Sequence, residues 1–279
     1  MIVFLNGRFV PEDQALVSAF DRGFLYGDGL FESIRVHLGA PFRWEEHLSR
    51  FEKGAAFLGI ALPVSPLELR NIAEELLARN QWQNGLLRLT LSRGVGLRGY
   101  SPQGANQPTL MLSLHALPAL NPQHPPQWRV ITSGFRLPAL QALALAKTAN
   151  KLTQIMARSE ADHAGVEEAF VLNTNGCYAE ATTSNLFWIR DGLVMTPPLA
   201  SGALPGVTRN LILELCPALG LDFKEANIDQ AGLFQSEGVF LSLTTLGIAE
   251  VIELDGRRLA RSHLTNTLRQ AVYEAMGIA

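Results

Sequence analysis

The sequence has very little cysteine and no concentrated metal-ligating motif. Its only cysteines are Cys177 and Cys216, and neither belongs to a CxxC pair. A disulfide framework or a thiolate metal site is therefore not expected. The six histidines are scattered and show no spacing typical of a metal pair. The sequence predicts a protein without a bound metal.

No charged run and no long apolar run interrupts the chain. The 23 basic and 26 acidic residues are nearly balanced, which argues against nucleic acid or an anionic membrane as a partner. No segment approaches the roughly 18 to 20 apolar residues that a membrane helix needs. The opening residues, MIVFLNGRFV, also lack the pattern of a signal peptide. We therefore expect a cytoplasmic protein.

Strand and helix patterns are mixed without a strict βαβ alternation, which favours an α+β fold. Asp21–Gly29 is expected to form a glycine-rich loop. The proline-rich segment Leu117–Gln127 is typical of a linker. It predicts a smaller N-terminal domain over residues 1–117, a linker over 118–127 and a larger C-terminal domain over 128–279. Apolar periodicity predicts helices at Trp44–Leu58, Pro66–Ala78, Asn150–Ala164, Gly206–Leu219 and Ser262–Met276.

Residues Gly94–Gly99 spell GxGxxG directly after a predicted strand. A dinucleotide-binding loop would also need a helix opening there and an acidic residue about 20 positions further on. Tyr100-Ser101-Pro102 follows instead, and residues 115–122 contain no acid. The motif predicts a flexible glycine-rich hairpin and leaves Arg93, Arg98 and Tyr100 without an explanation.

Lysine is scarce, with four lysines against nineteen arginines. Lys147 follows the apolar run Ala142–Ala146, and an apolar setting favours a neutral, nucleophilic amine. Taken alone, such a lysine is more often a surface residue whose stem lies along apolar groups. The surrounding residues decide between these interpretations.

Residues 145–189 resemble the core of the fold-type IV pyridoxal-phosphate (PLP) enzymes, the class IV aminotransferase family. This family includes branched-chain and D-amino-acid aminotransferases and 4-amino-4-deoxychorismate lyase. The matching positions are Lys147, Asn150, Glu180 and Ser184–Phe187, and the motifs DRGFLYGDGLFESIRV, His47–Arg50 and Leu204–Arg209 agree in order. The resemblance implies a two-domain, D-amino-acid aminotransferase-like fold with PLP in the interdomain cleft, and a homodimer.

The resemblance also implies roles for individual residues. Lys147 would carry PLP as a Schiff base and transfer protons, and Glu180 would face the pyridine nitrogen. Arg50 would bind the phosphate through charge-assisted hydrogen bonds. Gly206, Val207 and Thr208 would offer it a helix N-terminus, and the hydroxyl of Thr244 or Thr245 would complete the site. Without the resemblance, Glu180 would be interpreted as a polar residue at the end of a strand and Arg50 as an arginine on a helix surface. Gly206 is equally compatible with a simple turn, and the two threonines with ordinary strand positions.

The reaction is predicted from Ser92–Tyr100, which resembles the SRGxGxRGY stretch of aminodeoxychorismate lyases. That loop would present Arg98 and Tyr100 to a substrate carboxylate, and Phe31 would line the substrate site. The expected reaction forms 4-aminobenzoate and pyruvate, a step of folate biosynthesis.

Two segments depart from the lyase pattern. Residues Thr148–Leu152 differ from the sequence that usually follows the lysine in lyases, and Leu241–Gly256 resembles aminotransferases. An aminotransferase acting on branched-chain or D-amino acids, with a 2-oxo acid as acceptor, is therefore the alternative. A PLP carrier without catalytic activity is a more remote one, because storage needs no carboxylate at the ring nitrogen.

Overall fold

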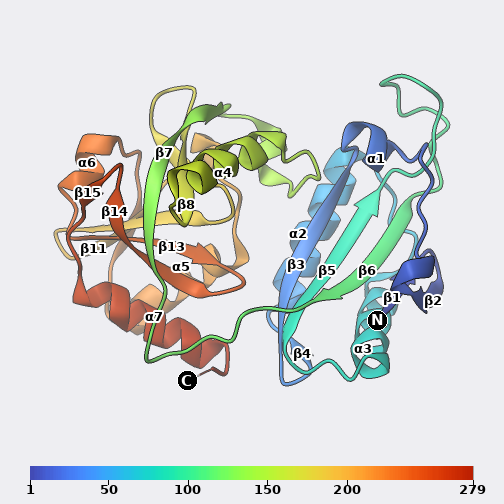
Figure 1. Ribbon diagram of the computed structural model, residues 1–279, viewed down its shortest axis with the longest axis horizontal. Coiled ribbons are helices and arrows are strands. Elements are labelled where there is room, and N and C mark those ends of the chain that lie inside the picture. The colour runs from blue at the N-terminus through green and yellow to red at the C-terminus, as the bar shows by residue number, and fades with distance from the viewer. Residues whose placement is uncertain (279) are drawn as a thin grey trace. The chain divides into compact units, whose positions relative to one another are not determined.

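The computed structural model describes residues 1–278 as two compact units (Figure 1). Unit 1 comprises Met1–Pro118 together with Ala146–Asn150, and unit 2 comprises Ala119–Leu145 and the residues from Lys151 onward. The sequence had placed Lys147 in the C-terminal domain. The structure instead groups its five-residue segment with the N-terminal unit.

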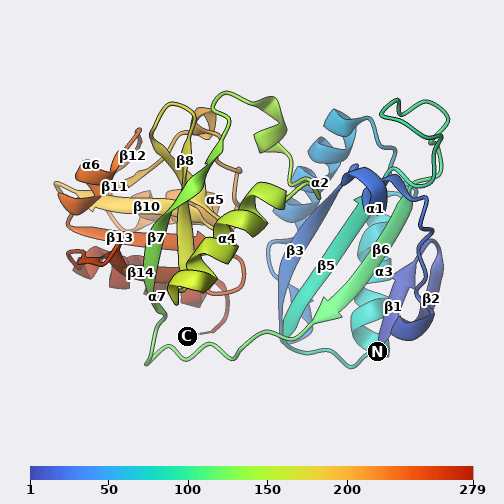
Figure 2. The same cartoon turned by 45° about the horizontal axis from the view of Figure 1, so that its top comes forward.

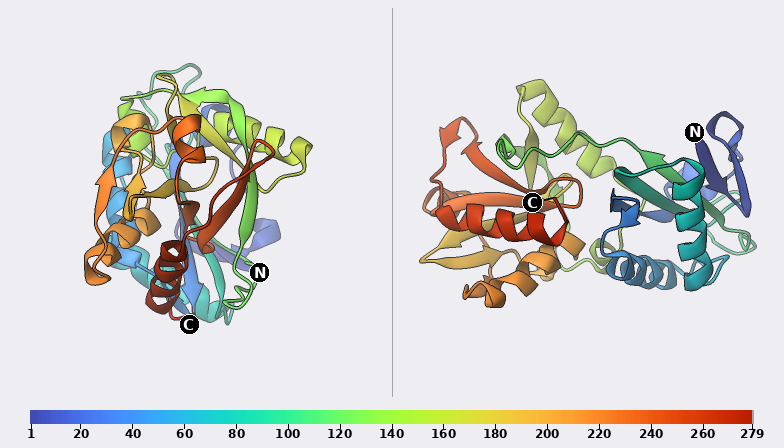
Figure 3. Two further views of the ribbon diagram at one scale, coloured as in Figure 1. Left: turned by 90° about the vertical axis from the view of Figure 1, so that its left-hand side faces the viewer. Right: turned by 90° about the horizontal axis from the view of Figure 1, so that it is seen from below.

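Unit 1 is a six-stranded antiparallel sheet covered by helices on one face (Figure 3). The strand order is β2-β1-β6-β5-β3-β4. The strands are β1 Ile2–Leu5, β2 Arg8–Pro11, β3 Gly29–His37, β4 Ala40–Pro41, β5 Gly85–Ser92 and β6 Thr109–His115. The helices are α1 Arg22–Tyr26, α2 Trp44–Leu58 and α3 Pro66–Arg79.

Alternation along the strands builds the core of unit 1. Every second residue of β5, namely Leu87, Leu89 and Leu91, is buried against α2 and α3. The opposite face of β5 carries half-buried residues such as Arg88. The sheet therefore has one apolar face under the helices and one mixed face that carries polar groups.

The helix ends follow from local sequence. Ser65 caps α3 by accepting a hydrogen bond from the Glu68 amide, and Pro66 occupies the first turn. Helix α2 ends at Gly59, whose φ of 64° suits a residue without a Cβ. The prediction of a plain loop at 21–29 was incomplete, because Asp21 caps the short helix α1 through the Gly23 amide.

Unit 2 contains a nine-stranded mixed sheet, with β12-β11-β10-β13-β14-β7-β8-β9 in order and β15 paired to β14. The strands are β7 Gln127–Leu137, β8 Glu168–Asn173, β9 Tyr178–Ala181, β10 Asn185–Arg190, β11 Leu193–Thr196, β12 Phe223–Glu225, β13 Gly238–Leu243, β14 Gly247–Leu254 and β15 Arg257–Arg258. The helices are α4 Leu152–Ala164, α5 Val207–Ala218, α6 Gln230–Phe234 and α7 His263–Ala275.

Helix α4 lies along β7 and β8, as Figure 2 shows, and buries Ala157 and Ala161 against Ala169 and Val171. Helices α5 and α7 pack against each other and against β13. Strands and helices are thus mixed in both units, with two separate sheets. This confirms the predicted α+β class. Within residues 1–278, no helix combines the length and apolarity needed to cross a bilayer.

Candidate active site

Backbone hydrogen bonds fix the Lys147 segment against strand β3. The Phe31 amide donates to the Lys147 carbonyl at 2.9 Å, and the Ala149 amide donates to the Gly29 carbonyl at 2.8 Å. Leu30 and Thr148 form an antiparallel bridge between them. These contacts explain why the segment belongs to unit 1, although the chain before and after it belongs to unit 2.

The side chain of Lys147 lies over an aromatic ring. Its Nζ is 4.8 Å from the centroid of Phe31, so two residues of the predicted site are neighbours. The guanidinium of Arg88 lies over the same ring at 4.0 Å. Burial lowers the pKa of Arg88, and no hydrogen bond or ion pair engages its guanidinium within the described residues. Phe31 therefore stands beside an amine and a guanidinium on the mixed face of the sheet, a setting suited to an anionic ligand.

The apolar run before Lys147 is mostly outside the buried core. Ala142–Leu145 forms a single 3₁₀ turn without a buried residue, and only Ala146 is buried, at 3% exposure. The aromatic contact comes from Phe31, across the sheet edge.

Arg50 makes a fork with a buried carboxylate. Its Nε donates to Glu32 Oε1 and its Nη2 donates to Glu32 Oε2, both at 2.7 Å. His47, one helical turn earlier on α2, places Nδ1 2.8 Å from Glu32 Oε2. The sequence predicted Arg50 as a phosphate ligand but did not identify Glu32 as its partner.

The electrostatics of this group are unusual. Burial alone would raise the pKa of Glu32, but the charge and hydrogen bonds of Arg50 and the contact with His47 lower it to about 2. Burial lowers the pKa of His47 and outweighs its hydrogen bond to Glu32. A carboxylate, a guanidinium and a neutral imidazole are therefore the expected forms near neutral pH.

In unit 2, two side chains hold the peptide that precedes helix α5. The Leu204 amide donates to Glu180 Oε2, and the Leu204 carbonyl accepts from Asn185 Nδ2, both at 2.8 Å. Glu180 belongs to β9 and Asn185 opens β10. Glu180, predicted to meet a pyridine nitrogen, thus also positions the approach to α5.

The N-terminus of α5 has no side-chain cap. Gly206 is the N-cap residue and makes no capping hydrogen bond through a side chain, and Thr208 is buried in the first turn. A Cβ at position 206 would overlap Asn185 Oδ1, so glycine is needed for close approach rather than for a left-handed turn. The amides of Val207 and Thr208 therefore begin a 12-residue helix that can receive an anion.

Thr244 and Thr245 lie in the turn between β13 and β14, and both are half-buried. Ser242, at the end of β13, pairs in register with Asn185. Asn185 therefore connects the strand leading to these threonines with the segment leading to α5. The hydroxyls of both Ser242 and Ser184 are buried and lack a partner within the described residues.

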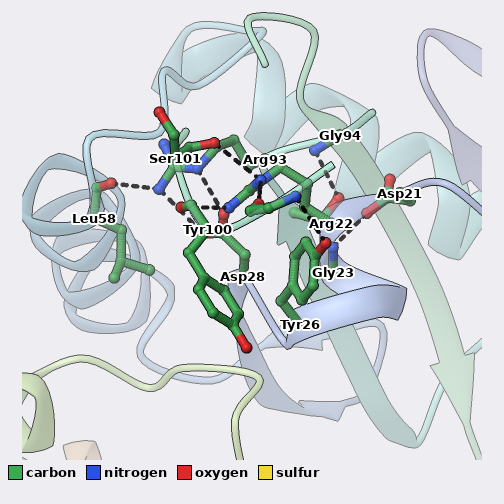
Figure 4. A network of polar contacts seen from close by, with 12 residues as sticks. Asp21, Arg22, Gly23, Tyr26, Asp28, Leu58, Arg93, Gly94, Tyr100 and Ser101 are labelled. Carbon is green, nitrogen blue, oxygen red and sulfur yellow. Dashed lines mark hydrogen bonds and ion pairs between the residues drawn. The ribbon is translucent and has the colours of Figure 1, made fainter. Parts of the chain in front are cut away.

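A polar network fixes the backbone of the loop that carries Arg98 and Tyr100 (Figure 4). Arg22 donates to the carbonyls of Gly99 at 2.8 Å and of Tyr100 and Ser101 at 3.1 Å. Its Nε donates to Asp28 Oδ2 at 2.8 Å. The loop is therefore held by α1, and is less free than the flexible hairpin predicted from its glycines.

Asp28 is shared by two arginines. Arg93 donates to both carboxylate oxygens of Asp28 and also to the carbonyls of Leu58 and Gly59 at the end of α2. Burial opposes the charge on Asp28, but the hydrogen bonds from Arg93 and Arg22 outweigh it and lower its pKa. Arg93, unexplained by the sequence, thus ties the loop to helix α2.

The side chains at the tip of the loop point outward. Tyr100 is 88% exposed and meets the Tyr26 ring edge-on at 5.6 Å. Arg98 is exposed, and no hydrogen bond or ion pair engages it within the described residues. The structure thus groups the predicted residues into five places: Phe31 with Lys147, Arg50 on Glu32, Glu180 with the α5 start, Thr244 with Thr245 in the β13–β14 turn, and Arg98 with Tyr100.

Each unit, taken by itself, carries groups of the kinds that bind PLP. Unit 1 has an amine beside an aromatic ring and a guanidinium held by a carboxylate. Unit 2 has a carboxylate and an uncapped helix N-terminus whose first turn contains a buried threonine. An amine suits an aldehyde, a guanidinium or a helix N-terminus suits a phosphate, and a carboxylate suits a ring nitrogen. Among residues 1–278, no three His, Cys, Asp or Glu side chains gather as a metal site would require.

Sequence reasoning missed several residues that build this site: Arg22, Asp28, Glu32, Arg88 and Asn185. Glu32 and Arg88 interrupt apolar strands, and a charged residue at such a position signals a paired or functional group. Arg22, Asp28 and Asn185 belonged to motifs already noted. The roles of Arg22 and Asp28 were not evident from those motifs, because most of their partners lie 65 to 79 positions away in the chain.

Comparison with known proteins agrees with the resemblance. The model of the amino-transferase class IV family matches residues 29–254. The chain is 35% identical over 258 residues to a putative branched-chain-amino-acid aminotransferase of Methanocaldococcus jannaschii, covering 92% of this chain and 89% of the relative.

Two solved structures are similar over nearly all of the chain. The branched-chain aminotransferase of the thermophilic archaeon Thermoproteus uzoniensis, solved with norvaline, has a TM-score of 0.91 at 27% identity, covering 100% of this chain and 95% of that one. The 4-amino-4-deoxychorismate lyase of Pseudomonas aeruginosa has a TM-score of 0.86 at 31% identity, covering 98% of both chains.

Proposed function

Because the chain belongs to the class IV aminotransferase family, whose members are PLP-dependent enzymes, we propose that it is a 4-amino-4-deoxychorismate lyase. The products are 4-aminobenzoate and pyruvate. The observation that carries this proposal is the Ser92–Ser101 loop, whose backbone Arg22 holds while Arg98 points outward. Similarity to the Pseudomonas aeruginosa lyase over 98% of both chains supports it.

Bound PLP supplies an electron sink for the negative charge left when a proton is removed. Lys147 is the group that holds it and that moves the proton, because its amine is placed by the backbone contacts with β3. The Phe31 ring fixes the lysine on the mixed face of the sheet. Arg88, over the same ring, is suited to attract a substrate carboxylate.

The remaining residues have binding tasks in this proposal. Glu180 keeps the ring nitrogen protonated while its other contact orients Leu204. In unit 1, Arg50 has the task of binding a phosphate through its guanidinium. In unit 2, the first amides of α5, at Val207 and Thr208, are suited to the same kind of ligand. Thr244 and Thr245 lie in the β13–β14 turn of unit 2, and a hydroxyl of either can donate to a phosphate.

An aminotransferase acting on branched-chain or D-amino acids, with a 2-oxo acid as acceptor, is the second candidate. It is favoured by the 35% identity to the putative Methanocaldococcus jannaschii aminotransferase. It needs the same lysine and carboxylate, because both reactions begin with removal of a proton next to the amino group.

One experiment separates the candidates. Purified protein with PLP is mixed with 4-amino-4-deoxychorismate, and pyruvate and 4-aminobenzoate are measured. In parallel, the cofactor absorbance is followed after addition of D-alanine, L-leucine or L-glutamate. A lyase releases both products in equal amounts. Loss of the absorbance with an amino acid, and no pyruvate from the first substrate, would establish the aminotransferase. Neither response would indicate a PLP carrier.

We also propose a cytoplasmic homodimer. Unit 1 exposes large apolar side chains on and before α1, with Leu16 82%, Phe20 70% and Phe24 77% exposed. An apolar patch of this kind is unfavourable in water unless a partner covers it. Light scattering at micromolar concentration should give twice the 30.5 kDa chain mass, and Phe24→Glu should shift the mass toward the monomer.

A further inference from the structure

Strand β3 carries a carboxylate on its apolar face. Glu32 alternates with Leu30 and Ile34, which are core residues, and it is itself fully buried at 0% exposure. A buried charge is costly unless other groups compensate it. An apolar residue at position 32 would avoid this cost. The role of the Glu32 carboxylate is therefore sought in the groups that contact it.

Three donors converge on Glu32. Two are Nε and Nη2 of Arg50, at 2.7 Å, and the third is Nδ1 of His47, at 2.8 Å. With both carboxylate oxygens engaged, the guanidinium plane of Arg50 is set by Glu32 rather than by its flexible stem. Both partners come from one face of α2, since His47 and Arg50 are three residues apart.

Only one of the two ring nitrogens of His47 has a hydrogen-bond partner within the described residues. Its Nδ1 must carry the proton to donate to a carboxylate, and its Nε2 is buried and has no partner within the described residues. A histidine kept only for packing would not require a polar atom in this place. The hydrogen bond from its Nδ1 fixes Oε2 of Glu32.

The three side chains of this group differ in their exposure to solvent. The side chains of Glu32 and His47 are each 1% exposed, whereas that of Arg50 is 10% exposed. Arg50 is therefore the most exposed of the three side chains, and an anion from outside the core meets it before it meets Glu32 or His47.

We propose that Glu32, braced by His47, is a positioning residue that holds the Arg50 guanidinium in the plane in which it receives the cofactor phosphate. This inference rests on the proposed function, because it takes Arg50 as a phosphate ligand. It assigns to Glu32 no contact with the cofactor itself. Its effect is transmitted through one side chain and should be specific to the phosphate.

The test compares two ligands that differ only in the phosphate. Full-length protein is freed of cofactor, and its dissociation constants for PLP and for pyridoxal are measured by absorbance titration. In Glu32→Gln, one oxygen is replaced by an NH₂ group, which faces at least one of the three donors and releases it. We expect the dissociation constant for PLP to rise about tenfold and that for pyridoxal to stay within about twofold.

The control is Glu45→Gln, which removes an exposed carboxylate that is ion-paired to Arg70 and lies on α2, the helix that carries Arg50. Both dissociation constants should remain at their wild-type values. Equal weakening of PLP and pyridoxal by Glu32→Gln would show a structural role only and overturn the proposal, as would no weakening at all. Failure of the wild-type protein to bind PLP would refute the proposed function instead.

A second pair of variants distinguishes a phosphate-specific effect from misfolding of the Glu32→Gln protein. Glu32→Asp keeps the charge but shortens the reach, so a smaller loss in the same ligand-specific direction is expected. In an Arg50→Met background, Glu32→Gln should cause no further change in the ratio of the two constants. A persistent change in that background would mean that Glu32 does not act through Arg50.

Discussion

The amine of Lys147 lies 4.8 Å from the ring centroid of Phe31, and the carbonyl of the same lysine accepts a 2.9 Å hydrogen bond from the Phe31 amide. Strand β3 thus controls both the backbone and the side chain of the lysine. This relationship explains how a residue in an irregular segment can be held firmly enough for chemistry. It also makes the lysine the first target for mutation.

Lys147→Ala is expected to abolish turnover and to remove the linkage to PLP that borohydride reduces. The amine is the only group at this position that can hold the cofactor and move a proton. Reduction followed by mass spectrometry of the peptides should locate the label on residue 147 in the wild type. Lys53→Ala, which changes an exposed lysine of α2, should behave as wild type. A label retained by Lys147→Ala would refute the assignment.

The Glu180→Gln variant is expected to fold normally but to have a lower kcat. The amide oxygen can still accept the Leu204 hydrogen bond, but the negative charge is gone. We expect kcat to fall roughly 100-fold, equivalent to about 2.7 kcal/mol of activation free energy, with the lysine linkage intact. Single-turnover rates measured with deuterated and with protonated substrate would show whether proton removal is the slowed step. A normal rate would mean that Glu180 only orients the approach to α5.

Arg22→Met is expected to loosen the loop that carries Arg98. Its guanidinium holds three loop carbonyls and Asp28. Its loss leaves the three carbonyls without this donor, whereas Asp28 keeps its hydrogen bonds from Arg93. Limited proteolysis should cut between residues 93 and 104 faster than in the wild type. KM for a substrate with a carboxylate should rise about tenfold, while PLP affinity stays unchanged. A loop as resistant as in the wild type would show that other contacts suffice.

The acid sensitivity of the fold should depend on Glu32. Its pKa falls from 4.5 to about 2 on folding, so the unfolded chain binds its proton more readily. The stabilisation is therefore complete above pH 4.5 and is lost as pH falls from 4.5 toward 2. It amounts to roughly 3 kcal/mol. Urea titrations at several pH values should show a shallower decline in this window for Glu32→Gln.

His47 should add to the same trend at higher pH. Burial lowers the pKa of His47, so folding disfavours its protonated form. Its contribution is therefore complete above the ordinary value of 6.5 and falls as pH drops below it. The urea midpoint of the wild type should decline already between pH 6.5 and 5. A flat profile there would contradict a neutral, buried His47.

The sequence by itself determined much of the secondary structure and the family. Periodicity placed α2 at Trp44–Leu58 as observed, and the Ser65-Pro66 pair placed the start of α3, because caps and apolar spacing are local properties. The motifs around Lys147 and Glu180 indicated the family, which the match over residues 29–254 confirms. The α+β class followed from the order of elements.

The tertiary structure alone decided which residues act together. The hydrogen bonds of Arg50 to Glu32 join a helix to a strand residue 18 positions away. Arg22 donates hydrogen bonds to carbonyls 77 to 79 positions away. The pairing of Lys147 with Phe31 likewise crosses from one segment to another. No periodicity records such contacts, since they arise when the packing of helices against a sheet brings distant side chains within hydrogen-bonding distance.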